Sequence, residues 1–176
     1  MRLASFSALA MVSGLVLGCS KPFSGDGVMI DKGFWSYPRY VITFDAFDPR
    51  TQPRITLKCN GPPRASMTLG LVVVPQGRNE DAEAMLRSTK WGRAILSVKV
   101  MKEDGKLVAE ARGPFEKWVI AISSQHRELW HENLRDVPFK PGLAYRIIIE
   151  VSGVDTGDPP LVLRPVLEGG GSERPW

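Results

Sequence analysis

The sequence predicts an all-β domain, an antiparallel β-sandwich with one short crossover helix. Two observations predict it. Apolar and polar residues alternate in short segments from residue 28 onward, and clusters of turn-forming residues separate these segments at intervals of about 10 to 20 residues. The composition fits one globular domain, because 43% of the 176 residues are hydrophobic and 24% are charged. We find neither an internal repeat nor a second domain boundary in the sequence.

Three strands are expected early in the domain, over residues 40–46, 55–59 and 67–74. In the second strand, Ile55, Leu57 and Cys59 share one face, so Cys59 is expected to be a small buried residue rather than a reactive thiol. The third strand is apolar on both faces over residues 71–74, which favours a central or covered position in a sheet.

A helix is expected over residues 79–91. Asn79 provides an N-cap, acidic residues follow in the first turn, and Gly92 ends the segment. Met85 and Leu86 give this segment an apolar face. We therefore expect a crossover helix that packs on the sandwich.

The segment over residues 96–111 predicts a β-hairpin, including its register. Asp104 and Gly105 are a two-residue turn signal. With the turn centred there, a single register gives an apolar face and two pairs of opposite charge. The expected partners are Val100 with Ala109, Val98 with Ala111, Lys99 with Glu110, and Glu103 with Lys106. A shift by one residue would destroy both sets of pairs.

Three more strands are expected, over residues 118–122, 145–151 and 161–167. Trp118 shares its parity with Ile120, which predicts a core position for Trp118. Pro165 lies within the last strand, and proline lacks the N–H that a ladder needs, so this strand is expected at a sheet edge.

Residues 134–151 resemble the loop and penultimate strand of immunoglobulin-like and fibronectin-like sandwiches. In those domains a Pro-Gly turn precedes an inward-facing tyrosine. The resemblance implies an immunoglobulin-like sandwich, in which the hydroxyl of Tyr145 closes back on the loop that precedes it.

Residues 1–18 have the pattern of a secretory signal peptide, because Arg2 is followed by an uncharged stretch that reaches Gly18. This stretch is shorter than the roughly 20 residues of a membrane-spanning helix. At its end, the sequence Val-Leu-Gly-Cys at residues 16–19 resembles the lipobox of bacterial lipoproteins. The resemblance implies diacylglycerol on Cys19 and cleavage before it, and Ser20 implies sorting to the outer membrane, facing the periplasm. A plain signal peptide, or a buried apolar Cys19, is the alternative.

The order of features over residues 31–167 also resembles a family of small proteobacterial lipoproteins of uncharacterised function. The matched residues of the closing strand are Pro141, Gly142, Tyr145, Ile147 and Ile149. This resemblance brings no catalytic residues. The expected organisation is a signal peptide over residues 1–18, a lipidated tether over 19–27, the sandwich over 28–168 and a flexible tail over 169–176.

The sequence contains none of the common catalytic or metal-binding motifs after the signal peptide, such as GxSxG, a P-loop, HExxH or CxxC. We therefore nominate no catalytic residue, no metal ligands and no cofactor. His126 and His131 are five residues apart, a spacing that converges on neither a helix nor a strand. Asp136, Asp155 and Asp158 lack the spacing of an EF-hand calcium loop.

The candidate binding residues are Trp130, His131 and His126, because Trp130 lies in a polar stretch where an exposed contact residue is expected. The expected function is a non-catalytic interaction module, anchored to the membrane by its N-terminal lipid, that binds an envelope or periplasmic protein. An immunity lipoprotein that neutralises an antibacterial toxin is one alternative. A cell-envelope hydrolase or carbohydrate-active protein is another. No nucleic-acid partner is expected, because the net charge of +4 is scattered without a basic run.

Overall fold

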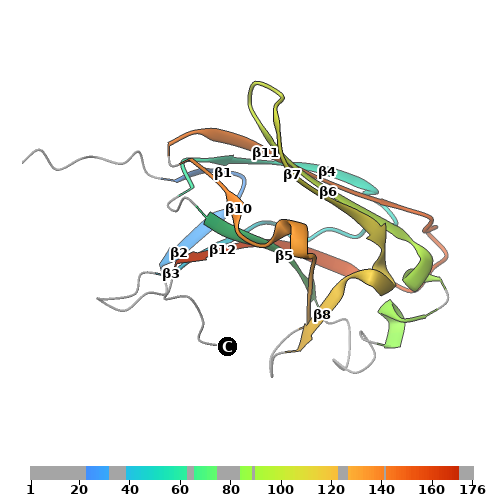
Figure 1. Cartoon of the computed structure of the whole chain (residues 1–176). Coiled ribbons are helices and arrows are strands. Elements are labelled where there is room, and N and C mark those ends of the chain that lie inside the picture. The colour runs from blue at the N-terminus through green and yellow to red at the C-terminus, as the bar shows by residue number, and fades with distance from the viewer. Residues whose placement is uncertain are drawn as a thin grey trace, which may run out of the picture.

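The computed structural model describes residues 23–31, 39–62, 66–74, 84–88, 90–122, 127–140 and 142–170. Two antiparallel sheets lie face to face in it (Figure 1), so the predicted β-sandwich is confirmed. The first sheet holds, in spatial order, β1 (Ser24–Gly25), β4 (Arg54–Asn60), β11 (Ala144–Ser152), β6 (Ile95–Lys102) and β7 (Leu107–Pro114). The second holds β2 (Val28–Asp31), β3 (Arg39–Thr43), β12 (Val162–Gly170), β5 (Ser66–Val74), β9 (Arg127–Trp130) and β8 (Val119–Ile122), while β10 (Val137–Pro138) also pairs with β5.

Helical structure is confined to short segments in the described part of the chain. The helix predicted over residues 79–91 is too long: residues 84–86 are α-helical, but the α-helix does not continue through residues 87, 88, 90 and 91. Residues 79–83 and 89 lie outside the described residues. Three 3-10 turns complete the fold: η1 (Trp91–Arg93), η2 (Phe115–Lys117) and η3 (Glu132–Leu134). Among the described residues, no helix has the length and apolar character to cross a membrane.

The strands pair in nested order along the chain. β6 pairs with β7, β5 with β9, β4 with β11, and β3 with β12, so the chain folds as one long hairpin that is then divided between two sheets. Additional pairing of β11 with β6 and of β12 with β5 completes the sheets. This order is that of a jelly roll. The chain therefore has the sandwich architecture of immunoglobulin-like domains with different strand connections.

The core consists of the inward-facing residues of both sheets. Burial alternates along the whole of β11, as the two-residue period predicts. β5 buries Met67, Leu69, Leu71 and Val73 and lies between β12 and β9, which confirms its predicted central position. Cys59 and Trp118 are also buried, as predicted.

The β6–β7 hairpin has the predicted register over its body. Val98 pairs with Ala111 and Val100 with Ala109. Between them, Lys99 lies opposite Glu110, with Nζ 3.1 Å from the carboxylate oxygen Oε1. The apolar and charged faces that fix the register are therefore both present.

The turn of this hairpin differs from the prediction. The N–H of Lys102 donates to the carbonyl of Lys106 at 2.9 Å, so the loop has three residues and the predicted pair of Glu103 with Lys106 is wrong. Gly105 closes this loop with a φ of 86°, which favours glycine. An extra residue in β7, Val108, then restores the predicted register.

The prediction that Pro165 marks an edge strand is wrong, because β12 pairs with β3 on one side and β5 on the other. The carbonyl of Pro165 faces β3 and accepts from the N–H of Phe44 at 3.1 Å. The regular ladder ends at Thr43 and resumes as a single bridge at Phe47. The missing N–H of Pro165 therefore faces an interruption in the neighbouring strand, where a proline is tolerated.

Tyr145 forms the predicted corner. Its ring is buried against Phe139, with ring centroids 4.8 Å apart, and its hydroxyl accepts a hydrogen bond from the N–H of Lys140 at 2.6 Å. This bond fixes the loop that precedes β11, as the resemblance to immunoglobulin-like sandwiches implies.

Both ends of the described chain lie within segments predicted to be irregular. β1 lies within the predicted tether of residues 19–27, and β12 continues to Gly170, two residues into the predicted tail of residues 169–176. Residues 1–22, including Cys19 and the lipobox, and residues 171–176 lie outside the described residues.

We predict that Tyr145→Phe lowers the free energy of unfolding by about 1 kcal/mol, because the ring packing stays while the hydrogen bond from Lys140 is lost. Urea denaturation followed by tryptophan fluorescence measures the change. Tyr145→Leu, which also removes the ring contact with Phe139, should cost more. Equal stability of Tyr145→Phe and the unmodified protein would show that the corner contributes nothing.

Candidate binding surface

The structure separates the binding residues predicted from the sequence. Trp130 is the last residue of β9, where its parity is opposite to that of the buried Leu129, so it lies half-exposed on the outer side of the second sheet. His131 follows with inward parity. Its ring contacts buried Trp118, with centroids 5.2 Å apart. His126 lies outside the described residues. The structure therefore does not bring Trp130 and His131 together.

His131 has a structural task in this arrangement. Its Nδ1 accepts a hydrogen bond from the N–H of Asn133 at 3.2 Å, which caps η3. Asn133 in turn donates its side-chain N–H to the carbonyl of Glu110 at 3.2 Å, so η3 links β9 to the edge of the first sheet. Trp130 therefore lies on the outer side of the sheet, whereas the His131 ring is used in internal contacts.

A second surface is built by the outer face of the first sheet. The registers of β4, β11, β6 and β7 place their outward residues in rows across the sheet. Five of these residues are cations: Arg54, Lys58, Lys99, Arg112 and Arg146. We call this set the basic face. Two carboxylates, Glu110 and Glu150, share it.

Some cations of the basic face lie beside a carboxylate, and others do not. Lys99 lies beside Glu110, and Arg54 lies opposite Glu150 in the register. Lys58, Arg112 and Arg146 are exposed and form no ion pair with any other described residue. The outer side of the second sheet differs, since β12 and β9 place Arg164, Glu128 and Glu168 there. Positive charge is therefore concentrated on one side of the sandwich.

Sequence reasoning missed the basic face because its cations come from four separate strands and never form a run. The signal that finds them is parity. In each strand, the cations occupy the positions that alternate with buried residues, such as Lys58 between Leu57 and Cys59. Only the strand order, which brings these four strands together, turns scattered cations into a surface.

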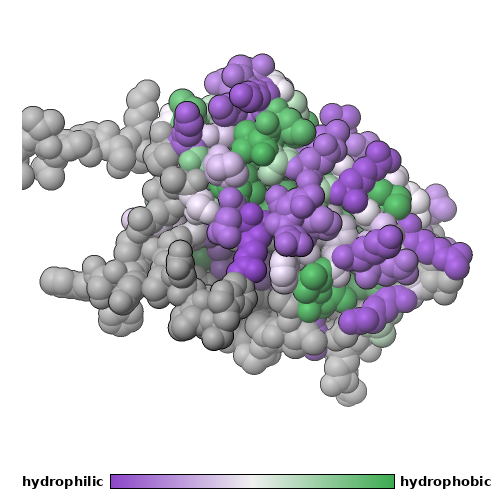
Figure 2. Space-filling view, in the orientation of Figure 1, coloured by the Kyte–Doolittle hydropathy of each residue, from purple (hydrophilic) through white to green (hydrophobic). Residues whose placement is uncertain are grey.

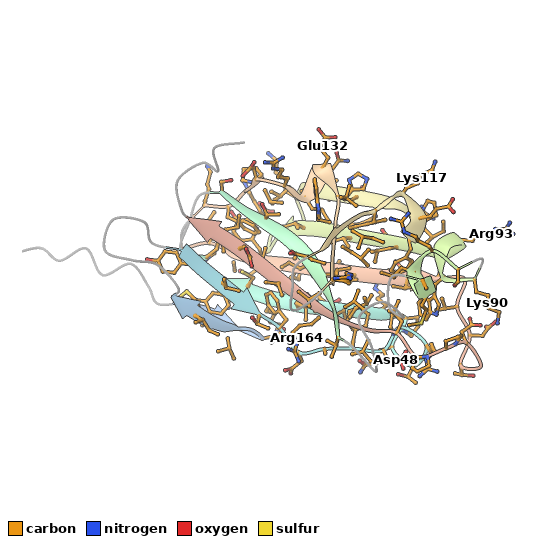
Figure 3. All side chains as sticks on the ribbon, turned by 90° about the horizontal axis from the view of Figure 1, so that it is seen from below. Asp48, Lys90, Arg93, Lys117, Glu132 and Arg164 are labelled. Atoms are coloured by element: carbon orange, nitrogen blue, oxygen red, sulfur yellow. The ribbon has the colours of Figure 1, made fainter. Side chains whose placement is uncertain are left out.

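A polar network closes the end of the sandwich that lies away from β1. The guanidinium of Arg50 forms a fork with the carboxylate of Asp48, with Nε 3.0 Å from Oδ1 and Nη2 2.6 Å from Oδ2. Arg50 also donates through Nη1 to the carbonyl of Asp158 at 2.8 Å, and Lys90 forms an ion pair with the Asp158 carboxylate. Figure 3 shows Asp48 and Lys90 at the same end of the sandwich as Arg93 and Lys117.

Asp158 organises this network. Its side chain is only 4% exposed, and Oδ2 accepts from the N–H of Asp155 at 2.9 Å. The hydrogen bond from Lys90, followed by that from Asp155, holds the pKa of Asp158 below its usual value. The hydrogen bond from Arg50 likewise lowers the pKa of Asp48. Both carboxylates stay ionised and engaged, which suits the fixing of loops rather than proton donation to a substrate.

The thiol of Cys59 is equally unsuited to chemistry, because burial raises its pKa to about 12. In the described part of the chain, no three His, Cys, Asp or Glu side chains gather as metal ligands would. Asp155 and Asp158, whose spacing does not fit a calcium loop, join the loop network. Asp136, with a φ of 53°, accepts from the hydroxyl of Ser66 at 3.2 Å.

No protein-family model and no curated protein matches this chain. One solved structure, described as carbohydrate-binding modules from the β-sandwich superfamily, matches with 11% sequence identity and a TM-score of 0.28. The similarity covers 82% of this chain and 51% of that chain, so this protein spans about half the length of that structure.

We predict that Asp158→Asn destabilises the protein at pH 7 and that the difference becomes smaller as the pH falls below about 5. The folded-state pKa of Asp158 lies below its usual value of 3.8, so its ionised form stabilises the fold above about pH 5. This contribution is lost as the pH falls through the folded-state pKa. The free energy of unfolding, measured between pH 7 and pH 3, tests the prediction.

The matched control is Glu116→Gln, which removes an exposed carboxylate outside the network. We expect its stability to follow that of the unmodified protein at every pH. A difference between Asp158→Asn and the unmodified protein that stays constant down to pH 3 would contradict the role of the ion pair.

Proposed function

We propose that this protein is a lipoprotein of the bacterial envelope, anchored through Cys19 to the outer membrane and facing the periplasm. We propose that its sandwich is a non-catalytic module that binds an acidic partner protein through the basic face. The single observation that carries the binding role is the basic face itself. It presents five cations on one side of a sheet, with only two carboxylates among them.

The basic face is suited to binding because it is held rigidly. β4, β11 and β6 are inner strands of its sheet, and the inward residues Ile147, Ile149, Val98 and Val100 of β11 and β6 are fully buried. Cations on such strands keep their spacing, so little conformational entropy is lost at the backbone when a partner binds. Neighbouring strands lie about 4.8 Å apart, which spaces the cations for contacts with several carboxylates of one partner.

Three observations support a binding role over catalysis. Cys59 is buried with a raised pKa, Asp48 and Asp158 are held ionised inside ion pairs, and the ring of His131 caps η3. Each of these groups is therefore either buried in the core or held in an ion pair or hydrogen bond that stabilises the fold. No family model matches the chain, and the proposed lipid anchor is based on the lipobox resemblance of residues 16–19.

The anchor is tested by metabolic labelling with radioactive palmitate in growing cells. We expect label in the protein and none in Cys19→Ser, because the acyl chains are attached at this sulfur. Globomycin, which blocks lipoprotein signal peptidase, should shift the gel mobility of the unmodified protein. Absence of label from the unmodified protein would overturn the anchor and leave the basic face to be tested separately.

The binding role is tested by crosslinking in intact cells followed by capture of the full-length protein. Arg54→Glu combined with Arg112→Glu should lower the affinity for the captured partner at least tenfold, because complementary charges become repulsive. The affinity for the unmodified protein should also fall as salt rises.

The matched control is Arg164→Glu, which makes the same change on the outer side of the second sheet. It should bind as the unmodified protein does. A partner lost with Trp130→Ala but retained by the basic-face variant would move the binding site to the second sheet and contradict our assignment.

A further inference from the structure

The chain reaches the sandwich at one fixed place. β1 pairs with the end of β4, with Ser24 opposite Asn60 and Gly25 opposite Cys59. The N–H of Asp26 then donates to the carbonyl of Lys58 at 3.1 Å, and the N–H of Lys58 donates to the Asp26 carboxylate at 2.7 Å. Four consecutive contacts therefore secure the chain against the first sheet.

Glycine at position 25 is required for this contact. Its φ is 143°, and a Cβ there would lie 2.2 Å from the carbonyl oxygen of Lys58, a backbone atom that cannot move aside. The close approach of β1 to β4 thus depends on Gly25. Ser24 follows Cys19 by five positions, so a lipid on Cys19 would lie within about 18 Å of Ser24 along an extended chain.

Exposed apolar side chains gather at this same end of the sandwich. Leu107, at the start of β7, is 49% exposed, and Leu143, just before β11, is 43% exposed. Two backbone hydrogen bonds fix these segments to each other and to the β4 end: Glu103 donates to Ala144 at 3.2 Å, and Gly61 donates to Leu143 at 3.0 Å. Figure 2 shows apolar surface beside the hydrophilic tip of the β6–β7 hairpin.

Cations occupy the same segments as these leucines and the adjoining strands. Lys102 and Lys106 flank the hairpin turn, Lys140 precedes Leu143, and Lys58 and Arg146 lie at the adjoining edge of the basic face. These five cations outnumber four described carboxylates of the same end, Asp26, Glu103, Asp104 and Asp136, the last of which lies 3.9 Å from Arg135. Two of these carboxylates also accept backbone hydrogen bonds, Asp26 from Lys58 and Asp104 from Lys106. Exposed leucines in segments that also carry lysines match the chemistry of an anionic lipid surface.

We infer that this end, which we call the tether end, lies against the membrane, with Leu107 and Leu143 among the headgroups of anionic phospholipids and Lys102, Lys106 and Lys140 beside their phosphates. The inference rests on the proposed lipid anchor at Cys19. The nine residues of β11 span about 30 Å, so the Asp48–Asp158 network at its other end points into the periplasm. In this orientation the strands run away from the membrane surface, and the basic face, on one side of the sandwich, stays accessible to a partner.

The test places an environment-sensitive fluorophore on single introduced cysteines of the lipidated protein. Leu143→Cys and Leu107→Cys carry the label at the tether end. Thr156→Cys, exposed in the loop after β11, carries it at the opposite end, beside the Asp48–Asp158 network, which we call the far end. Cys59 is buried with a pKa of about 12, so it stays unlabelled in the folded protein. The protein is reconstituted into phosphatidylethanolamine vesicles that contain phosphatidylglycerol and a lipid-borne quencher.

We expect quenching at positions 107 and 143 to exceed that at position 156 at least twofold. Replacing phosphatidylglycerol by phosphatidylcholine, or introducing Lys106→Glu with Lys140→Glu, should reduce this ratio, whereas Lys117→Glu at the far end should leave it unchanged. The mass of the N-terminal peptide reports separately on the lipid at Cys19. Equal quenching at all three positions in a protein that carries the lipid overturns this inference and leaves the anchor intact. A peptide without lipid overturns the anchor instead.

Discussion

Burial of one side of every strand is the constraint on which the rest of this structure depends. Side chains along a strand point alternately to opposite faces, so apolar residues that fill the core force their neighbours outward. In β11 this places Ile147 and Ile149 inside and Arg146 and Glu150 outside. The basic face is a direct consequence, because the cations on four strands occupy the positions that the core leaves free.

The two ends of the sandwich are closed by different interactions. At the tether end, the hydroxyl of Tyr145 holds the loop before β11, and its ring packs on Phe139. At the far end, Trp91 packs edge-on against Phe115, with centroids 5.8 Å apart, and donates its indole N–H to the carbonyl of Pro159. Ion pairs around Asp158 then fix the loops outside this aromatic pair. The far end is thus charged and rigid, whereas the tether end exposes leucines.

This polarity gives the molecule a direction that suits a tethered binding module. One end receives the chain through β1 and carries exposed Leu107 and Leu143, and the other carries the ionic network. The basic face extends along one side between them. The exposed cations of the basic face create a positive potential that extends into solvent, which suits the acidic partner that we propose. The buried thiol of Cys59 and the engaged carboxylates of Asp48 and Asp158 contribute to stability rather than to chemistry.

The sequence by itself determined the longer strands, their inward faces, the register of the β6–β7 hairpin and the role of Tyr145, because these depend on the two-residue period and on contacts between nearby residues. The short strands β1, β2, β9 and β10 were not predicted. Only the tertiary structure decided the strand order. Nested pairing places Pro165 in an inner strand opposite an interruption in β3, which no local pattern predicts. The basic face and the network around Asp158 also could not be predicted from the sequence, since their residues come from distant segments. Such contacts are fixed by the packing of the two sheets, whereas sequence patterns record only each segment's own periodicity.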